Sequence, residues 1–200
     1  MNIQETIRLF LPKYLSPDAQ QNLLDCIKDF PDNIDSRFYT NYLKDKPVLY
    51  QGDGIRQLPI SNFPGNEIRK QQAVIFSNTC DTDLENKRLF PSRIIYAPIV
   101  ELSKYKRFLE RNGIAQTRID NHISTIKKQE ITQVFYLPPN TSFNESIVFM
   151  DRLNNCSNAY IDRDELPKQR IFTLSNYGYY LFLLKMSLSM MRIHEKVDRG

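Results

Sequence analysis

The densest group of side chains able to do chemistry is the run Ser77-Asn78-Thr79-Cys80-Asp81, which directly follows a continuous apolar stretch. Polar residues at the exit of a buried strand are often placed to build a site. A cysteine nucleophile also needs a base that generates the thiolate, and His122, beside Asp120, is a candidate for that role. The catalytic candidates in this run are Ser77, Cys80 and Asp81. Such a cluster also commonly caps its own backbone, and cysteine is often buried, so a structural role is the stronger hypothesis.

Metal and cofactor chemistry is not indicated by the remaining ligand types. The two histidines, His122 and His194, form no HExxH or paired arrangement, so we expect no metal site and no cofactor. The three cysteines, Cys26, Cys80 and Cys156, are an odd number without a CxxC spacing. They indicate free thiols in a reducing cytosol, and hence a cytoplasmic protein.

The composition is that of a globular chain. Of the 200 residues 41% are apolar and 25% charged, with a net charge of +4, so the chain has no basic arm that would bind duplex DNA by charge alone. Seven Lys and Arg against four Asp and Glu fall within residues 101–130, and a solvated helix face explains that excess. Lys185 interrupts the apolar run 177–191, and the first fifteen residues lack the pattern of a signal peptide. We therefore expect no membrane segment.

The patterns along the chain predict helices before, within and after a set of strands. Ser16 and Pro17 begin a helix that ends near Phe30. Helices are also expected near residues 102–112 and 118–130, and from Ser175 to His194. Strands are expected in 47–63, 73–76, 94–100, 133–137, 146–150, 159–161 and 170–174. The residues expected in the core of the sheet are Val74, Ile75, Phe76, Ile95, Ala97 and Ile99.

These elements predict the α+β class: a small, curled antiparallel sheet or SH3-like barrel with added helices. We expect one compact domain overall. Residues 1–46 would form a helical extension, and residues 47–200 a barrel with inserted helices at 101–130 and a final helix at 175–194.

The stretch Gln51–Val100 resembles the opening half of the MazF/PemK-like barrels. It reads Gly-Asp, then a strand with a proline-bearing loop, then VIFSNTCD, then IIYAPI. The segments VIFSNTCDTD and IIYAPI, with Phe-Tyr-Leu-Pro at 135–138, look most like an uncharacterised bacterial group with a Ser-x-x-Cys-Asp motif on such a barrel. The resemblance implies a bacterial stress, toxin–antitoxin or antiviral-defence context.

The RNA-cleaving members of that superfamily use an arginine beside the second core strand and a Thr or Ser after the next one. The arginine position here is Gln72, with Arg69 and Lys70 just before it, and the Thr/Ser position is Val100 or Glu101. One hypothesis is therefore a metal-independent endoribonuclease with Arg69 as the catalytic cation and Lys70 beside it. RNA is a candidate partner under this hypothesis.

The hypothesis that we prefer on the sequence is a non-catalytic regulatory or partner-binding module, and the endoribonuclease is the alternative. The final helix is apolar over most of its circumference and must be buried on all sides. One stripe of this helix is expected in the core: Leu181, Leu184, Leu188 and Met191. The opposite side is expected to bind a protein partner or a second copy of the chain, through Tyr179, Phe182, Met186 and Met190.

Overall fold

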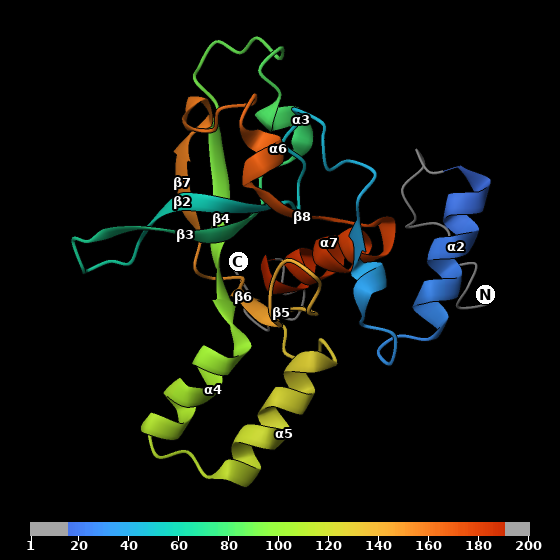
Figure 1. Ribbon diagram of the computed structural model, residues 1–200, viewed down its shortest axis with the longest axis vertical. Helices are drawn as coiled ribbons and strands as arrows, with labels where there is room; N and C mark the ends of the chain where they lie inside the picture. The colour runs from blue at the N-terminus through green and yellow to red at the C-terminus, as the bar shows by residue number, and fades with distance from the viewer. Residues whose placement is uncertain (1–15, 191–200) are drawn as a thin grey trace, which may run out of the picture.

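The molecule is built on one antiparallel sheet of eight strands (Figure 1). The structure, a computed structural model, describes residues 16–190. The strands are β1 (Tyr39–Thr40), β2 (Gly54–Ser61), β3 (Ile68–Ile75), β4 (Arg93–Glu101), β5 (Val134–Leu137), β6 (Ser146–Phe149), β7 (Asn154–Ser157) and β8 (Arg170–Leu174). The helices are α2 (Pro17–Lys28), α3 (Thr79–Thr82), α4 (Leu102–Arg111), α5 (Gln116–Lys127), α6 (Leu166–Gln169) and α7 (Asn176–Met190), with 3-10 turns η1 (Ser36–Phe38) and η2 (Asn158–Tyr160).

The sheet is curled but not closed. Its strand order is β1-β8-β2-β3-β4-β6-β5, with β7 paired to β4, and among residues 16–190 no ladder joins β1 to β5. The two ends of the order nevertheless meet through side chains. The Tyr39 hydroxyl donates a hydrogen bond to the Pro138 carbonyl at 2.7 Å, and the rings of Phe38 and Phe135 lie 5.7 Å apart. The α+β class and the curled antiparallel sheet are therefore as predicted.

Both faces of the central strands are buried, which explains their continuous apolar sequence. Val74 points into the main core, which α2 and α7 cover, whereas Ala73 and Ile75 point into a second core. Of the predicted core residues, Val74, Ile75, Phe76 and Ala97 are buried and Ile99 packs against the main core. The prediction for Ile95 was wrong, because this side chain alternates with buried neighbours on β4 and is 43% exposed.

The helices α2 and α7 begin at the serines that the sequence indicated. The Ser16 side chain accepts a hydrogen bond from the Ala19 N–H at 3.2 Å, and the Ser175 hydroxyl accepts one from the Gly178 N–H at 3.2 Å. Gly178 lets α7 approach the backbone of η1, since a Cβ there would lie 2.3 Å from the Phe38 carbonyl oxygen. The segment 1–46 was predicted as a helical extension alone, but it also supplies β1, which pairs with β8.

A helical hairpin, α4 followed by α5, stands on the end of the sheet made by β5 and β6 (Figure 1). Just after α5, Gln129 adopts a left-handed backbone conformation with φ of 60°. Its side-chain amide donates to the Tyr136 carbonyl at 2.7 Å and accepts from the Tyr136 N–H at 3.0 Å. This pair of hydrogen bonds fixes the end of α5 to β5.

Some local predictions were wrong. Residues 48–50 are not a strand, because the backbone there turns toward Asp53, whose carboxylate accepts from the Tyr50 N–H at 3.0 Å. Residues 159–161 fall in η2 and just beyond it, and the strand of this region is the more polar β7. The predicted last helix is present as α7, and its predicted end at 191–194 lies outside the described residues.

Candidate functional site

A buried ion pair organises the turn that precedes β2. The Arg170 guanidinium donates to the Asp53 carboxylate at 3.0 Å, and both side chains are almost fully buried. Arg170 also donates to the carbonyls of Leu43, Lys44, Lys46 and Val48. Burial raises the pKa of Asp53 to about 6, although Arg170 acts in the opposite direction. Arg170 is saturated by the protein itself, so this pair is a structural anchor rather than a ligand-binding group.

The side chains of the Ser77–Asp81 run make hydrogen bonds chiefly to backbone groups of the run itself, of β4 and of the turn before β2. Ser77 Oγ accepts from the Ile95 N–H at 2.7 Å, and Asn78 Oδ1 accepts from the Cys80 N–H at 2.9 Å as the N-cap of α3. Thr79 Oγ1 accepts from the Gln51 N–H at 3.1 Å. Side-chain to backbone bonds of this kind are what the structural hypothesis for this run predicted.

The proposed cysteine constellation does not assemble. Cys80 is exposed on α3, and Asp81 forms an ion pair with Arg88. His122 lies on α5, where its ring nitrogen is 3.1 Å from the Tyr105 hydroxyl. Figure 1 shows α3 and α5 at opposite ends of the molecule. A Cys80–His122 pair is therefore ruled out by the geometry.

The exposed part of this run lines a cavity of about 390 Å³. Asn78, Thr79 and Cys80 meet Tyr179 of α7 there, and the Tyr179 hydroxyl donates to the Gln51 side chain at 2.8 Å. The described residues that line it carry no charged side chain. This cavity can offer hydrogen bonds, but it provides no charge for an anionic ligand.

Gln72, at the expected arginine position, comes together with Glu101, one of the two candidates for the Thr/Ser position; the other candidate, Val100, does not line the same cavity. Gln72 and Glu101 line one cavity of about 510 Å³, together with Lys104. The side chains that meet there are an amide and a carboxylate in place of an arginine and a hydroxyl. Arg69 lies further out on β3, exposed and paired with Glu67 at 2.5 Å, and Lys70 is exposed beside it.

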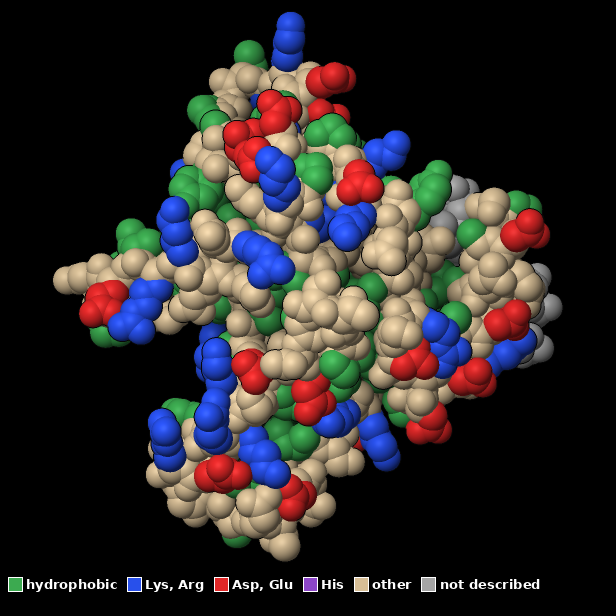
Figure 2. Space-filling model, viewed as in Figure 1, with side chains coloured by type: hydrophobic (Ala, Val, Ile, Leu, Met, Phe, Trp, Pro, Cys, Tyr) green, Lys and Arg blue, Asp and Glu red, His purple; other side chains and the backbone are tan. Residues whose placement is uncertain are grey.

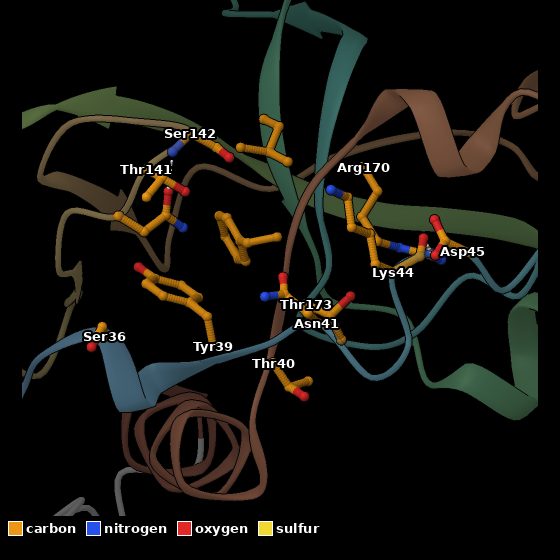
Figure 3. A pocket seen from close by; sticks show the side chains of 13 residues that line it. Ser36, Tyr39, Thr40, Asn41, Lys44, Asp45, Thr141, Ser142, Arg170 and Thr173 are labelled. Carbon is orange, nitrogen blue, oxygen red and sulfur yellow. Dashed lines mark hydrogen bonds between the residues drawn. The ribbon is translucent and has the colours of Figure 1, made fainter.

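Another polar cavity, of about 680 Å³, adjoins the Gln72–Glu101 cavity, since Ser142 lines both. Figure 3 shows Tyr39, Thr141 and Ser142 on one side of this cavity and Arg170 and Asp45 on the other. Most of its lining residues carry a hydroxyl or an amide group, and Lys44, Asp45 and Arg170 carry charge. The loop that carries Ser142 thus separates two polar hollows on one side of the sheet.

One face of α4 continues from the Gln72–Glu101 cavity as a basic stripe. Lys104, Arg107, Phe108 and Arg111 follow the spacing i, i+3, i+4, i+7 and are all exposed, with Phe108 at 59%. Figure 2 shows Lys and Arg side chains gathered over α4, and a hollow between this helix and the projecting β2–β3 hairpin. Gln71 and Gln72 of β3 and Lys104 of α4 line its floor. We call this hollow the hairpin–α4 groove.

The partner surface predicted on α7 is largely part of the core. Phe182 is fully buried, with its ring 5.0 Å from that of Phe76, and Met186 packs against the same core. Tyr179 is half-buried, and of the four predicted contact residues only Met190 is exposed. Leu184 and Leu188, predicted to be buried, are instead exposed, and Met191 lies outside the described residues.

The physical reason lies in the composition of α7. The helix is apolar nearly all round, so periodicity could not identify its inner face. That inner face includes Lys185, which donates a hydrogen bond to the Gln129 carbonyl. Burial lowers the pKa of Lys185 to about 8.

Comparisons with known proteins do not identify this chain. No family model matches it, and no curated protein matches its sequence. Within residues 16–190, no helix is long and apolar enough to cross a membrane. The described part of the chain also contains no cluster of three or more His, Cys, Asp or Glu side chains suited to a metal ion.

Proposed function

We propose that the protein is a non-catalytic RNA-binding module on a MazF/PemK-like scaffold, and that single-stranded RNA lies in the hairpin–α4 groove. The observation that carries this proposal is the basic face of α4. Lys104, Arg107 and Arg111 project from one side of the helix, and Lys104 itself reaches the cavity at the floor of the groove. Basic residues that follow a groove, with aromatic rings beside them, are the usual means of holding a single strand.

The charge on this face is available to an external anion. Lys106, on the inner side of α4, is held by Asp120 at 3.3 Å. Of Lys104, Arg107 and Arg111 on the outer side, Lys104 alone has a carboxylate of residues 16–190 within 4 Å, and that is Glu101 at 3.8 Å. The exposed ring of Phe108 stands between the basic side chains and offers a surface for base stacking.

The groove supports binding better than cleavage. Cleavage through the 2′-hydroxyl requires a cation that stabilises the transition-state charge at the scissile phosphate. In the cavity beside β3, glutamine (Gln72) stands at the expected arginine position, and the one cation among the described residues of its lining, Lys104, has Glu101 3.8 Å away. Arg69 lies on the outer part of the hairpin and does not line this cavity. Glu101 would also repel a phosphate placed deep in this cavity.

The proposal is tested by fluorescence polarisation with a labelled single-stranded oligoribonucleotide at several salt concentrations. The variant Lys104→Gln/Arg107→Gln/Arg111→Gln removes the basic face of α4. We expect it to weaken binding at least tenfold and to reduce the slope of log K against log salt by about 2, since each phosphate contact on a single strand contributes about 0.7.

A matched control removes the same charge elsewhere. The variant Lys87→Gln/Arg118→Gln/Lys128→Gln changes three exposed residues outside the α4 face, and its affinity should stay within about threefold of wild type. An equal loss of RNA affinity in both variants would mean that net charge alone causes it, and would contradict a binding site on α4. Gel analysis of the same RNA supplies the second readout. Cleavage that disappears in Arg69→Ala would replace the binding proposal by the endoribonuclease hypothesis.

A protein partner is the second candidate function, and a different surface now favours it. The loop between α3 and β4 exposes Leu84, Leu89 and Phe90, which no part of the described chain covers. We propose that these residues, rather than α7, would contact a second copy of the chain. Sedimentation over a range of concentrations tests this. A dimer that Leu89→Ser/Phe90→Ser converts to a monomer supports the candidate, and a wild-type monomer throughout removes it.

A further inference from the structure

The β2–β3 hairpin projects from the sheet as a two-stranded ribbon (Figure 1). Near its base, β2 carries a bulge between Ile55 and Leu58, where Gln57 has a φ of 61°. A bulge increases the local twist and bends the strand, so it aims the outer half of the ribbon away from the sheet. The ribbon ends in the turn at residues 62–67, which the Gly65 N–H closes by donating to the Asn62 carbonyl at 2.9 Å.

The turn presents an aromatic ring to solvent. Phe63 is 88% exposed, whereas Leu58 and Ile60 on β2 of the same ribbon are buried. A single exposed apolar side chain is ordinary. This one, however, sits at the end of a ribbon whose outer part also carries Arg69 and Lys70, both exposed, against one acidic residue, Glu67.

We propose that Phe63 stacks on a base of the single-stranded RNA held in the hairpin–α4 groove, while Arg69 and Lys70 contact the phosphates on either side of that base. This inference rests on the proposed function and adds a second wall to the same site. An aromatic ring flanked by basic side chains matches the alternation of bases and phosphates along a single strand. Phe108 on α4 and Phe63 on the ribbon then offer one stacking surface on each side of the groove.

The position of Arg69 fits this role better than a catalytic one. It faces Ile60 across the ribbon, and its only partner among the residues at 16–190 is the exposed Glu67 carboxylate. An exposed pair of this kind contributes little to stability, so Arg69 can exchange Glu67 for a phosphate at small cost.

The chain contains no tryptophan, so Phe63→Trp creates a single reporter at the tip of the ribbon. Its emission is measured during titration with the same oligoribonucleotide. We expect quenching that saturates with the dissociation constant found by polarisation, and an affinity equal to or tighter than wild type. Tyr42→Trp places the reporter at another exposed aromatic position, outside the ribbon, and should show no quenching.

Two further variants separate stacking from simple apolar bulk. Phe63→Ala should weaken binding about 5- to 150-fold, the range that loss of one stacked base produces, with an unchanged salt slope. Phe63→Leu keeps an apolar side chain without a ring and should lose nearly as much. Arg69→Gln/Lys70→Gln should instead lower the salt slope by about 1.4.

The outcomes distinguish this inference from the proposed function. If the α4 variant loses RNA but Phe63→Trp is not quenched, or Phe63→Leu binds like wild type, the stacking role is wrong and the RNA-binding proposal stands. If wild type binds no oligoribonucleotide, both fail. Thermal melting of each variant confirms that the exposed tip can be changed without loss of the fold.

Discussion

The hydroxyl of Tyr39 donates a hydrogen bond to the carbonyl of Pro138, 2.7 Å away, and thereby joins the two ends of the strand order without a ladder. Tyr39→Phe removes this bond and keeps the ring contacts with Phe143 and Phe172. We expect the free energy of unfolding to fall by about 0.5–1.5 kcal/mol. Urea denaturation measures it, and Tyr42→Phe, at an exposed position, should cause no change.

The buried pair of Arg170 and Asp53 should be far more costly to break. Arg170→Met leaves the Asp53 carboxylate and the carbonyls of residues 43–48 without their donor. The expected loss of unfolding free energy is about 3–5 kcal/mol. Arg69→Met breaks the exposed pair with Glu67 and should cost less than about 1 kcal/mol. Similar losses in the two variants would contradict the structural role of Arg170.

Asp53 also predicts a dependence of stability on pH. Its pKa is raised from 3.8 to about 6 in the folded protein, mainly by burial. The folded state therefore binds the carboxyl proton of Asp53 more tightly than the unfolded state does. The resulting stabilisation of the fold is complete below pH 3.8 and is lost as the pH rises to about 6. We expect the unfolding free energy of wild type, relative to that of Asp53→Asn, to fall by about 3 kcal/mol across this window. A difference independent of pH would overturn the assignment.

Two residues of α7 test which face of that helix is buried. Phe182→Ala empties a site in contact with Phe76 and Phe135, and should cost about 3–5 kcal/mol. Leu184→Ala, two residues along, changes an exposed side chain and should stay within about 0.5 kcal/mol. Thermal or urea unfolding distinguishes the two. The reverse order would restore the faces predicted from the sequence.

The sequence predicted the fold well where local signals agree. The runs 73–76 and 94–100 form neighbouring strands, as expected for short, nearly continuous apolar runs buried between two layers. Ser16 and Ser175 fixed the starts of two helices through their caps. β7 was missed because its sequence, Asn-Asn-Cys-Ser, lacks the residues that favour strands and owes its conformation to pairing with β4.

The candidate site could be predicted from local sequence patterns only in part. Arg170 and Asp53 are 117 residues apart, and no local pattern marks either as half of a buried pair. The charge excess at 101–130 was visible, but its meaning depends on the face of α4 that meets the groove. That face is known only once Lys104 is seen to share a cavity with Gln72.

The side chain of Gln129 has a consequence for the edge of the sheet formed by β5. β5 is the last strand of the sheet, and its sequence, Val-Phe-Tyr-Leu, is one that would readily template another strand. Gln129 occupies both outward backbone groups of Tyr136, as an incoming chain would. Gln129, just after α5, thus blocks hydrogen bonding at this edge, and a second molecule adding a strand there in the manner of a fibril would first have to displace its side chain.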